Sequence, residues 1–551
     1  MANGMGSLMV GATGLRSSQT ALNTTAHNLS NVNTEGYTRQ QITFADSTYA
    51  NVFSKSLNKG KYGLGVDIDA ISRIRNEFID RSYRTESSRL GFYESQANAV
   101  YEVQDWFGEM QGVTYQKHIT NLYNAVNELT KNPTSTIARS SLIQNATAFI
   151  DRSEAIYSGL KDYQVTLNTE VNNMVEKINS LGQKIYNLNK GIVKVEAEGV
   201  ERANDLRDSR DLALDELSKY IDIDYYETKD GEVIVSAENV PFITKNDIAK
   251  MSVREEGTYG LLIPQWEGYQ QDVYNFDKQA NNANDTDKGK LKGLLIARGV
   301  IEVNYKDIPV MPERADYDLT TEQGMAEYNS AMDAYQQKQD YYNKYIEPSA
   351  ILSAIAGFDK LVNGIVTAMN DVLCPETTMN TTKELTDADG NILKAEKYVY
   401  NASAHDVLYD SHGNAVAGKE NGDGTYSYEA SEKLYGDANQ EETENIDSMT
   451  YKILDMSKAG YGMDDDETRG VELFKRNGTD RYKQITGADG STIYVRNNLN
   501  VTGFETDYTL GNLIVNPKAS QNVGTLPLST EHGKEDFSKV NELIDTFSKK
   551  F

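Results

Sequence analysis

The chain has 551 residues, and its 39% hydrophobic content is enough for the cores of roughly three or four domains. Its formal net charge of -27 repels phosphate backbones and anionic lipid, so we expect no nucleic acid and no membrane among its partners. Cys374 is the single cysteine and cannot form an intrachain disulfide, and we find neither a cleavable secretory signal nor an apolar run of about 20 residues.

The first predicted element is a one-sided apolar helix near the N-terminus. Its leucines recur every seven residues, which is the spacing of a heptad seam: Leu8, Leu15, Leu22 and Leu29. Asn31, Asn33 and Gly36 follow, and these residues tolerate the turn and left-handed conformations that end a helix. A stripe of this kind needs a cover, so we predict that it is an interface.

A helical pattern then runs from about residue 86 to residue 221. We expect Asn132 to cap one helix, with Pro133 at its first position. The strongest periodic series alternates by four and three residues: Leu167, Val171, Met174, Ile178, Leu181, Ile185, Leu188 and Ile192. Extended back to Phe149, it predicts a rod on the order of 70 Å long. The rod is either an ordinary core helix or a coiled-coil strut, and both are architectural.

After residue 221 the apolar period changes from that of a helix to that of a strand. Ile223 and Tyr225, and then Val233 and Val235, alternate on either side of the turn sequence KDG. This pattern predicts a β-hairpin. We place the hairpin in a small β unit at about residues 222–276.

The second half of the chain alternates between helical and strand patterns. Helices are predicted at residues 291–297 and 351–372, and residues 301–347 between them read as an exposed acidic helical insertion rich in Tyr and Gln. Residues 375–510 carry repeated Asp-Gly and Asn-Gly turn signals between short apolar runs, which predicts a β-rich domain.

These patterns together predict an α+β multidomain fold, in which a long antiparallel α-helical bundle or coiled-coil core carries inserted β-rich domains. The predicted divisions are an N-terminal segment at 1–85, a helical rod domain at 86–374, an inserted β-rich outer domain at 375–510, and a return segment to the helical domain at 511–551.

Candidate chemistry is sparse. The sequences DADGN and NGDGT resemble pieces of a calcium loop, but the glutamate and flanking helices of that loop are missing, so hairpin turns are the better interpretation. His405 and His412, with Asp406 and Asp410 between them, do not have metal-site spacing. Cys374 has no histidine nearby in sequence and is expected to be structural. We therefore predict no catalytic residues, no metal and no cofactor.

One stretch carries a family resemblance. GLRSSQTALNTTAHNLSNVNTEGYTRQQ, residues 14–41, resembles the N-terminal signature of bacterial flagellar axial proteins, the rod, hook and hook-associated group. Two further stretches favour the hook-associated members: GLGVDIDAISRIRNEFIDRSYR at 63–84 and NDLRDSRDLALDELSKYIDI at 204–223. The residues that match the N-terminal signature are Asn28, Ser30, Asn31, Asn33, Gly36 and Tyr37.

The resemblance implies a structural subunit, without enzymatic activity, that joins hook to filament by helical self-assembly. The N-terminal segment is then disordered in the monomer, and orders when copies assemble. Implied partners are further copies of the chain, the hook protein, hook-associated protein 3 and a flagellar export chaperone. The implied location is the extracellular flagellum, reached by type III export without a cleaved signal.

The resemblance also implies a long C-terminal helix that pairs with the N-terminal one and carries the chaperone site. The sequence lacks this helix, and we expect truncation rather than a different mode of assembly. Three alternatives stay open. The chain is another axial protein, such as hook protein or hook-associated protein 3; it is a flagellum-associated peptidoglycan-cleaving enzyme with a carboxylate-lined cleft in residues 375–510; or its outer domain binds glycans.

Overall fold

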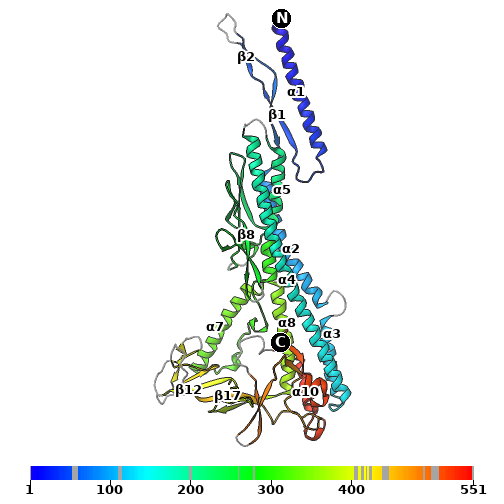
Figure 1. Cartoon of the computed structure of the whole chain (residues 1–551), viewed down its shortest axis with the longest axis vertical. Coiled ribbons are helices and arrows are strands. Elements are labelled where there is room, and N and C mark those ends of the chain that lie inside the picture. Colours follow the sequence, from blue (N-terminus) through cyan, green and yellow to red (C-terminus); the bar gives the residue numbers. More distant parts are fainter. Residues whose placement is uncertain are drawn as a thin grey trace. The chain divides into compact units, whose positions relative to one another are not determined.

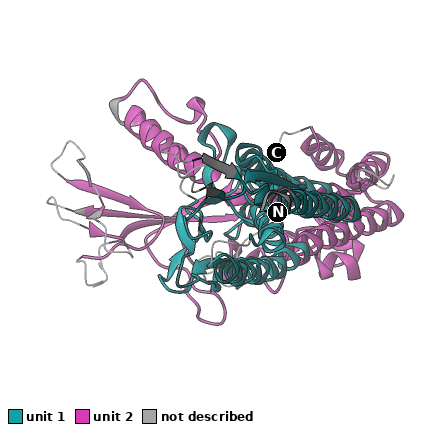
Figure 2. Ribbon diagram, turned by 90° about the horizontal axis from the view of Figure 1, so that it is seen from above, with its two compact units in different colours: residues 1–101, 163–302, 343–352 teal, residues 102–162, 303–342, 353–551 magenta. Residues whose placement is uncertain are grey.

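The computed structural model describes residues 2–52, 60–108, 114–197, 202–257, 260–276, 280–402, 408–410, 415–416, 418–420, 425–436, 446–487, 490–497 and 508–548. The chain folds into two compact units, each built from several segments (Figure 2). Unit 1 holds residues 1–101, 163–302 and 343–352, and unit 2 holds residues 102–162, 303–342 and 353–551. Long helices and several small antiparallel sheets confirm the predicted α+β class.

The described residues form ten α-helices (Figure 1): α1 Ala2–Ser30, α2 Glu77–Phe107, α3 Tyr115–Leu129, α4 Thr136–Glu196, α5 Asn204–Tyr220, α6 Lys290–Arg298, α7 Glu322–Tyr345, α8 Ala350–Leu373, α9 Pro517–Gln521 and α10 Phe537–Thr546. The helices predicted at 291–297 and 351–372 are α6 and α8. Ser349 opens α8, because its hydroxyl accepts a hydrogen bond from the N–H of Leu352 at 3.2 Å.

The long helix predicted beyond Phe149 is α4, which has 61 residues. The predicted cap at Asn132 is wrong. The Asn132 carboxamide oxygen accepts from the N–H and the hydroxyl of Thr134, at 3.0 and 2.8 Å, and so closes a turn before the helix. Ser135 caps α4 instead, since its hydroxyl accepts from the N–H of Ala138 at 3.3 Å.

In the part of unit 1 that the structure describes, the strands form two antiparallel pairs and two three-stranded sheets, with the KDG hairpin among them as predicted. The pair β1 Gln40–Asp46 with β4 Val66–Arg73, and the pair β2 Tyr49–Val52 with β3 Gly60–Gly63, follow α1. The two three-stranded sheets comprise β5 Ile223–Glu227, β6 Val233–Ala237, β7 Val240–Ile243, and then β8 Met251–Glu256, β9 Leu261–Trp266 and β10 Gln271–Asp272.

The part of α4 in unit 1 packs on these two sheets. Seven of the eight residues of its periodic series are buried, and Leu188 is half-buried. Gly182 lies so close to the Phe242 ring that a Cβ at this position would be 2.5 Å from it. Asn179 donates to the carbonyl of Met251 at 2.8 Å and accepts from the N–H of the same residue at 2.9 Å. The amide thus completes the hydrogen bonding of a strand.

Unit 2 contains a seven-stranded antiparallel sheet whose main path is β15-β16-β12-β17-β20-β19, with β11 paired to β17. Its strands are β11 Glu376–Thr381, β12 Lys397–Ala402, β15 Lys419–Glu420, β16 Tyr426–Ala430, β17 Ile446–Leu454, β19 Tyr482–Thr486 and β20 Thr492–Arg496. Two further pairs are β13 Leu408–Tyr409 with β14 Ala415–Val416, and β18 Phe474–Arg476 with β21 Leu513–Val515. Buried tyrosines, Tyr398, Tyr400, Tyr428 and Tyr451, dominate the core of the sheet.

Helix α8 is long and apolar enough to cross a membrane by length and composition, which the sequence analysis did not anticipate. Half of its most apolar window is buried inside the structure, as in the core helix of a globular domain. Ile355, Val362 and Met369 lie along its buried face in unit 2.

Candidate assembly interface

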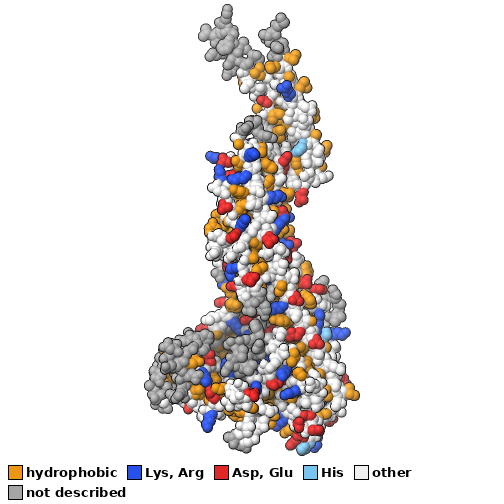
Figure 3. All heavy atoms as spheres, in the orientation of Figure 1, with side chains coloured by type: hydrophobic (Ala, Val, Ile, Leu, Met, Phe, Trp, Pro, Cys, Tyr) orange, Lys and Arg blue, Asp and Glu red, His pale blue; other side chains and the backbone are white. Residues whose placement is uncertain are grey.

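The leucines of α1 form an exposed stripe. Leu8, Leu15, Leu22 and Leu29 expose 77%, 75%, 64% and 74% of their surface. With the exposed alanines Ala12 and Ala26, they constitute what we call the leucine seam. Figure 3 shows hydrophobic side chains along this helix, which Figure 1 labels α1 in the same orientation. Side chains of this size bury most of their surface in ordinary protein cores, so a contiguous exposed stripe indicates an interaction surface.

The other side of α1 is attached to the β1–β4 hairpin. Ser17 is buried, and its hydroxyl donates to the carbonyl of Val66 at 3.3 Å. Thr13, one turn earlier, lies against Gly65, which has a φ of +115°. A Cβ at Gly65 would be 2.0 Å from the Thr13 hydroxyl, so only glycine fits this contact. The helix is therefore held on the side opposite to the seam.

Asn28 fixes the end of α1 to the start of β1. Its carboxamide oxygen accepts from the Gln40 N–H at 2.9 Å and from the Tyr37 hydroxyl at 2.7 Å, and its amide donates to the Gln40 carbonyl at 2.9 Å. His27 Nδ1 lies 3.0 Å from the same hydroxyl. Burial raises the pKa of Tyr37, and the carboxylate of Asp208 adds to the shift, so the phenol stays protonated and able to donate.

The turn after α1 contains the signature residues Asn31, Asn33 and Gly36. Asn31 donates from its side chain to the carbonyl of His27 at 3.0 Å and accepts from the Thr34 hydroxyl at 3.2 Å. Asn33 is exposed in this turn. Gly36 has a φ of +79°, and a Cβ there would be 3.2 Å from Leu212 of α5. Glycine thus allows the chain to turn against α5.

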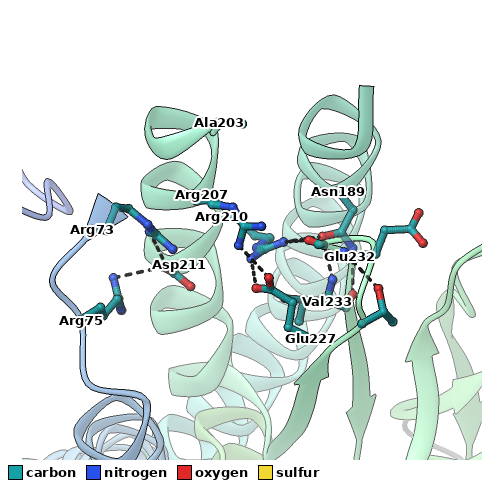
Figure 4. A network of polar contacts seen from close by, with 12 residues as sticks. Arg73, Arg75, Asn189, Ala203, Arg207, Arg210, Asp211, Glu227, Glu232 and Val233 are labelled. Atoms are coloured by element: carbon teal, nitrogen blue, oxygen red, sulfur yellow. Dashed lines mark hydrogen bonds and ion pairs between the residues drawn. The ribbon is translucent and has the colours of Figure 1, made fainter. Parts of the chain in front are cut away.

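The three stretches that carry the family resemblance meet at one place in unit 1, which we call the joint. Asp208 of α5 accepts from the N–H of Thr38 at 3.1 Å and from Arg73 of β4 at 2.7 Å. Arg73 also donates to Asp211 at 2.7 Å (Figure 4). Arg84 of α2 pairs with Asp215 at 2.7 Å.

The charges of the joint are largely buried. The side chains of Arg73 and Asp211 are 12% and 11% exposed. Burial alone would raise the pKa of Asp211, but the guanidinium groups of Arg75 and Arg73 outweigh it and hold the pKa below its usual value. The joint was not predicted from the sequence. The signal was the spacing of Asp208, Asp211 and Asp215 by three and four residues, which puts all three carboxylates on one face of α5.

Among the residues that the structure describes, the other candidates do not form a chemical site. Cys374 is buried, and burial raises the pKa of its thiol. Asp387 of the DADGN turn accepts from the N–H groups of Asp389 and Asn391, at 3.0 and 2.9 Å, as in a hairpin-like turn. His405 and His412 lie outside the described residues, as does most of NGDGT. Within the described ranges, no group of three or more His, Cys, Asp or Glu side chains is placed to hold a metal ion.

Comparisons with known proteins agree with the resemblance. The family described as the flagellar hook-associated protein FlgK helical domain matches residues 100–331, and the flagella basal body rod protein family matches residues 8–38. Flagellar hook-associated protein 1 of Bacillus subtilis (strain 168) is 30% identical over 310 residues, which are 54% of this chain and 61% of that protein. The protein of the same name from Salmonella typhimurium is 26% identical over 213 residues, 38% of this chain and 37% of that protein.

The chain therefore spans less than two thirds of the length of these relatives. One solved structure, the flagellar hook junction protein FlgK from Burkholderia pseudomallei, has a TM-score of 0.36 and 13% identity, over 75% of this chain and 72% of that chain. The rod-protein match at residues 8–38 coincides with the seam and the turn that follows it.

Proposed function

We propose that the chain is a member of the flagellar hook-associated protein family and a structural subunit of the junction between hook and filament, assembling with further copies through the leucine seam. The observation that carries the proposal is that the four leucines of α1 expose at least 64% of their surface. Full burial of each leucine contributes roughly 1.5–3 kcal/mol, so neighbouring copies that cover the seam supply a substantial driving force.

The geometry of α1 suits a polymer. The contacts of Ser17 and Asn28 hold the helix by one side, and leave the seam free on the other. A seam that contacts a different surface on the next copy makes head-to-tail contacts, and such contacts give an open helix unless the rotation closes a ring. The joint fixes the start of the β1–β4 pair to α5, because Asp208 binds both Thr38 and Arg73. Since α1 is attached to this pair, its direction relative to α5 is defined.

The proposal extends to location and partners. Relatives with this name are flagellar proteins, and we infer an extracellular position in the flagellum, export without a cleaved signal peptide, and contact with the hook protein on one side and hook-associated protein 3 on the other. The proposed partners also include a flagellar export chaperone. They do not include nucleic acid or a membrane, because a net charge of -27 repels both.

The test is to replace Leu15 and Leu22 with aspartate. Because both side chains are exposed, the monomer should keep its circular dichroism spectrum and melting temperature. Incorporation at the hook tip, measured by immunoblotting of isolated hook–basal bodies, should be lost. The matched control places aspartate at Arg16 and Asn23, exposed polar residues of the same helix that lie about 100° around its axis from Leu15 and Leu22, and should incorporate. Normal incorporation of the leucine variant would contradict the proposal.

One observation keeps the enzyme alternative worth testing. A cleft of about 380 Å³ in unit 2 is lined by Asp387 and Glu472. Hydrogen bonds, first that of Asn391, lower the pKa of Asp387 to about 2, while burial raises the pKa of Glu472, and opposed shifts of two carboxyl groups are typical of acid–base pairs. Against catalysis, both carboxylates are already engaged, by Asn391 and by Tyr508. Steady release of soluble fragments from peptidoglycan would favour the enzyme.

A further inference from the structure

A cleft of about 300 Å³ in unit 1 is lined by seven arginines and four carboxylates. The arginines come from residues 73–84 and 202–210, and the cleft lies next to the joint. A surplus of arginine is unexpected in a chain whose net charge is -27. Four further carboxylates, Asp208, Asp215, Glu196 and Asp224, pair with these arginines without lining the cleft. The hydrogen bonds of each arginine therefore show whether it has N–H donors left for a ligand.

Most of the arginines are saturated. Arg207 donates to both oxygens of Glu196 at 2.8 Å. It also donates to Glu227 at 2.7 Å (Figure 4). Two arginines differ. Arg81 donates from one terminal nitrogen to a backbone carbonyl at 3.0 Å, but it reaches only one carboxylate, Asp224, at 3.7 Å, and this pair is 52% and 87% exposed. Arg202 is exposed and forms no ion pair with any residue in the described part of the chain.

Arg210 also lines the cleft, and its side chain is 1% exposed. Its terminal nitrogens are bonded, one to the Gly231 carbonyl at 2.6 Å and the other to Glu227 at 2.7 Å. Its Nε is fully buried and has no acceptor among the described residues. Burial lowers the pKa of Arg210 in spite of the attraction of Glu227, so its charge is under-compensated. A bound anion would supply the negative charge that the buried guanidinium of Arg210 lacks.

We propose that this cleft binds a small multivalent oxyanion of the phosphate or sulfate type, with Arg81 and Arg202 supplying its free donors and the buried charge of Arg210 adding electrostatic attraction. Guanidinium groups present planar forks of N–H donors that match the oxygens of such anions. Glu77 also lines the cleft, is exposed, and opposes the anion by charge repulsion. The ligand would join α2 to α5. This binding proposal does not depend on the assembly function proposed above.

The experiment titrates the full chain with inorganic phosphate by isothermal titration calorimetry, with chloride added to keep the ionic strength constant. Saturable binding with a dissociation constant on the order of 1 mM is expected, and sulfate should compete. The double variant Arg81→Gln and Arg202→Gln should weaken binding about tenfold, while Glu77→Gln should tighten it about threefold.

The control is Arg254→Gln. Arg254 is a partly exposed arginine of β8 in the same unit that pairs with Asp272 at 2.9 Å and does not line the cleft, so its replacement should not change phosphate binding. Arg81 and Arg202 are exposed, so the double variant should keep the unfolding temperature of the parent. A response that chloride reproduces, or equal affinity in the parent and the double variant, would overturn the proposal.

Discussion

Single side chains decide how α1 is held to the rest of unit 1. The Asn28 carboxamide offers the Gln40 backbone one acceptor and one donor, both at 2.9 Å. A neighbouring strand would offer the same pair of groups, so the helix end is joined to β1 without a strand of its own. An aspartate at this position would keep the acceptor and lose the donor. The asparagine of the signature thus has a specific structural reason.

Glu196, at the end of α4, makes the stability of unit 1 depend on pH. The hydrogen bond from Arg207 lowers the pKa of Glu196 from 4.5 to about 2 in the folded chain. A carboxyl group with a depressed folded pKa adds stability above its unfolded pKa, and this stability is lost as the pH falls from about 4.5 to about 2. After allowance for solvent screening we expect a contribution of roughly 1–2 kcal/mol at neutral pH.

The variant Glu196→Gln tests this. In a Trp106→Phe background, Trp266 is the only tryptophan, so its fluorescence reports the urea unfolding of unit 1. The variant should be less stable than the parent at about pH 6, and the difference should shrink at about pH 3. A difference in free energy of unfolding that is the same at both values would show that the Glu196 charge is not its source.

At the scale of elements, α4 is anchored to its sheets by asparagines as well as by its apolar face. Asn179 and Asn189 each donate to the carbonyl and accept from the N–H of one strand residue. Asn168 donates to the Gly260 carbonyl just before β9 and accepts from the N–H of Leu262 in β9. The three lie 11 and 10 residues apart, which is close to three helical turns. One face of α4 therefore forms hydrogen bonds with β9, then β8, then β6 along its length.

Replacing Asn179 with alanine should destabilise unit 1 by roughly 2–3 kcal/mol, because the N–H and carbonyl of buried Met251 both lose their partner. The unfolding of unit 1 followed by Trp266 fluorescence measures this change. The control Asn173→Ala, on the exposed face of the same helix, should stay within about 0.5 kcal/mol of the parent. Equal effects of the two substitutions would mean that the strand contact contributes nothing.

Helices and strands could be predicted from the sequence more accurately than the side-chain contacts between them. Heptad spacing identifies α1 and α4, because it reflects which face of a helix is apolar, and this property is local. The cap of α4 was misplaced, since Asn132 and Ser135 are both good caps and only the three-dimensional turn decides between them. The asparagines of α4 and the carboxylates of α5 looked like ordinary solvated positions. Their partners lie 21 to 170 residues away, so no local pattern identifies which residues they contact.

The leucines of the candidate interface could be named from the sequence, because leucine at every seventh position is typical of a helix that packs against a partner. The manner in which α1 is held could not be predicted. It depends on Ser17, which looks like any polar residue in the sequence, and on the close approach of Thr13 to Gly65. The convergence of residues 14–41, 63–84 and 204–223 at the joint also required the structure.

At the scale of the whole molecule, two forces oppose each other in the proposed assembly. Each copy carries a net charge of -27, so copies repel at low ionic strength. The leucine seam of α1 attracts through apolar burial, which salt does not screen. Salt should therefore favour the polymer, because it removes repulsion and leaves attraction intact.

This balance gives a measurable prediction for the full chain. Raising the NaCl concentration from about 0.05 M to about 0.5 M shortens the screening length from more than 10 Å to about 4 Å. The concentration of chain at which sedimenting polymer first forms should fall several-fold over this range. In the variant with aspartate at Leu15 and Leu22, no polymer should form at either salt concentration. If polymer formation instead required more protein at high salt, ion pairs between copies, rather than the leucine seam, would be the main contact.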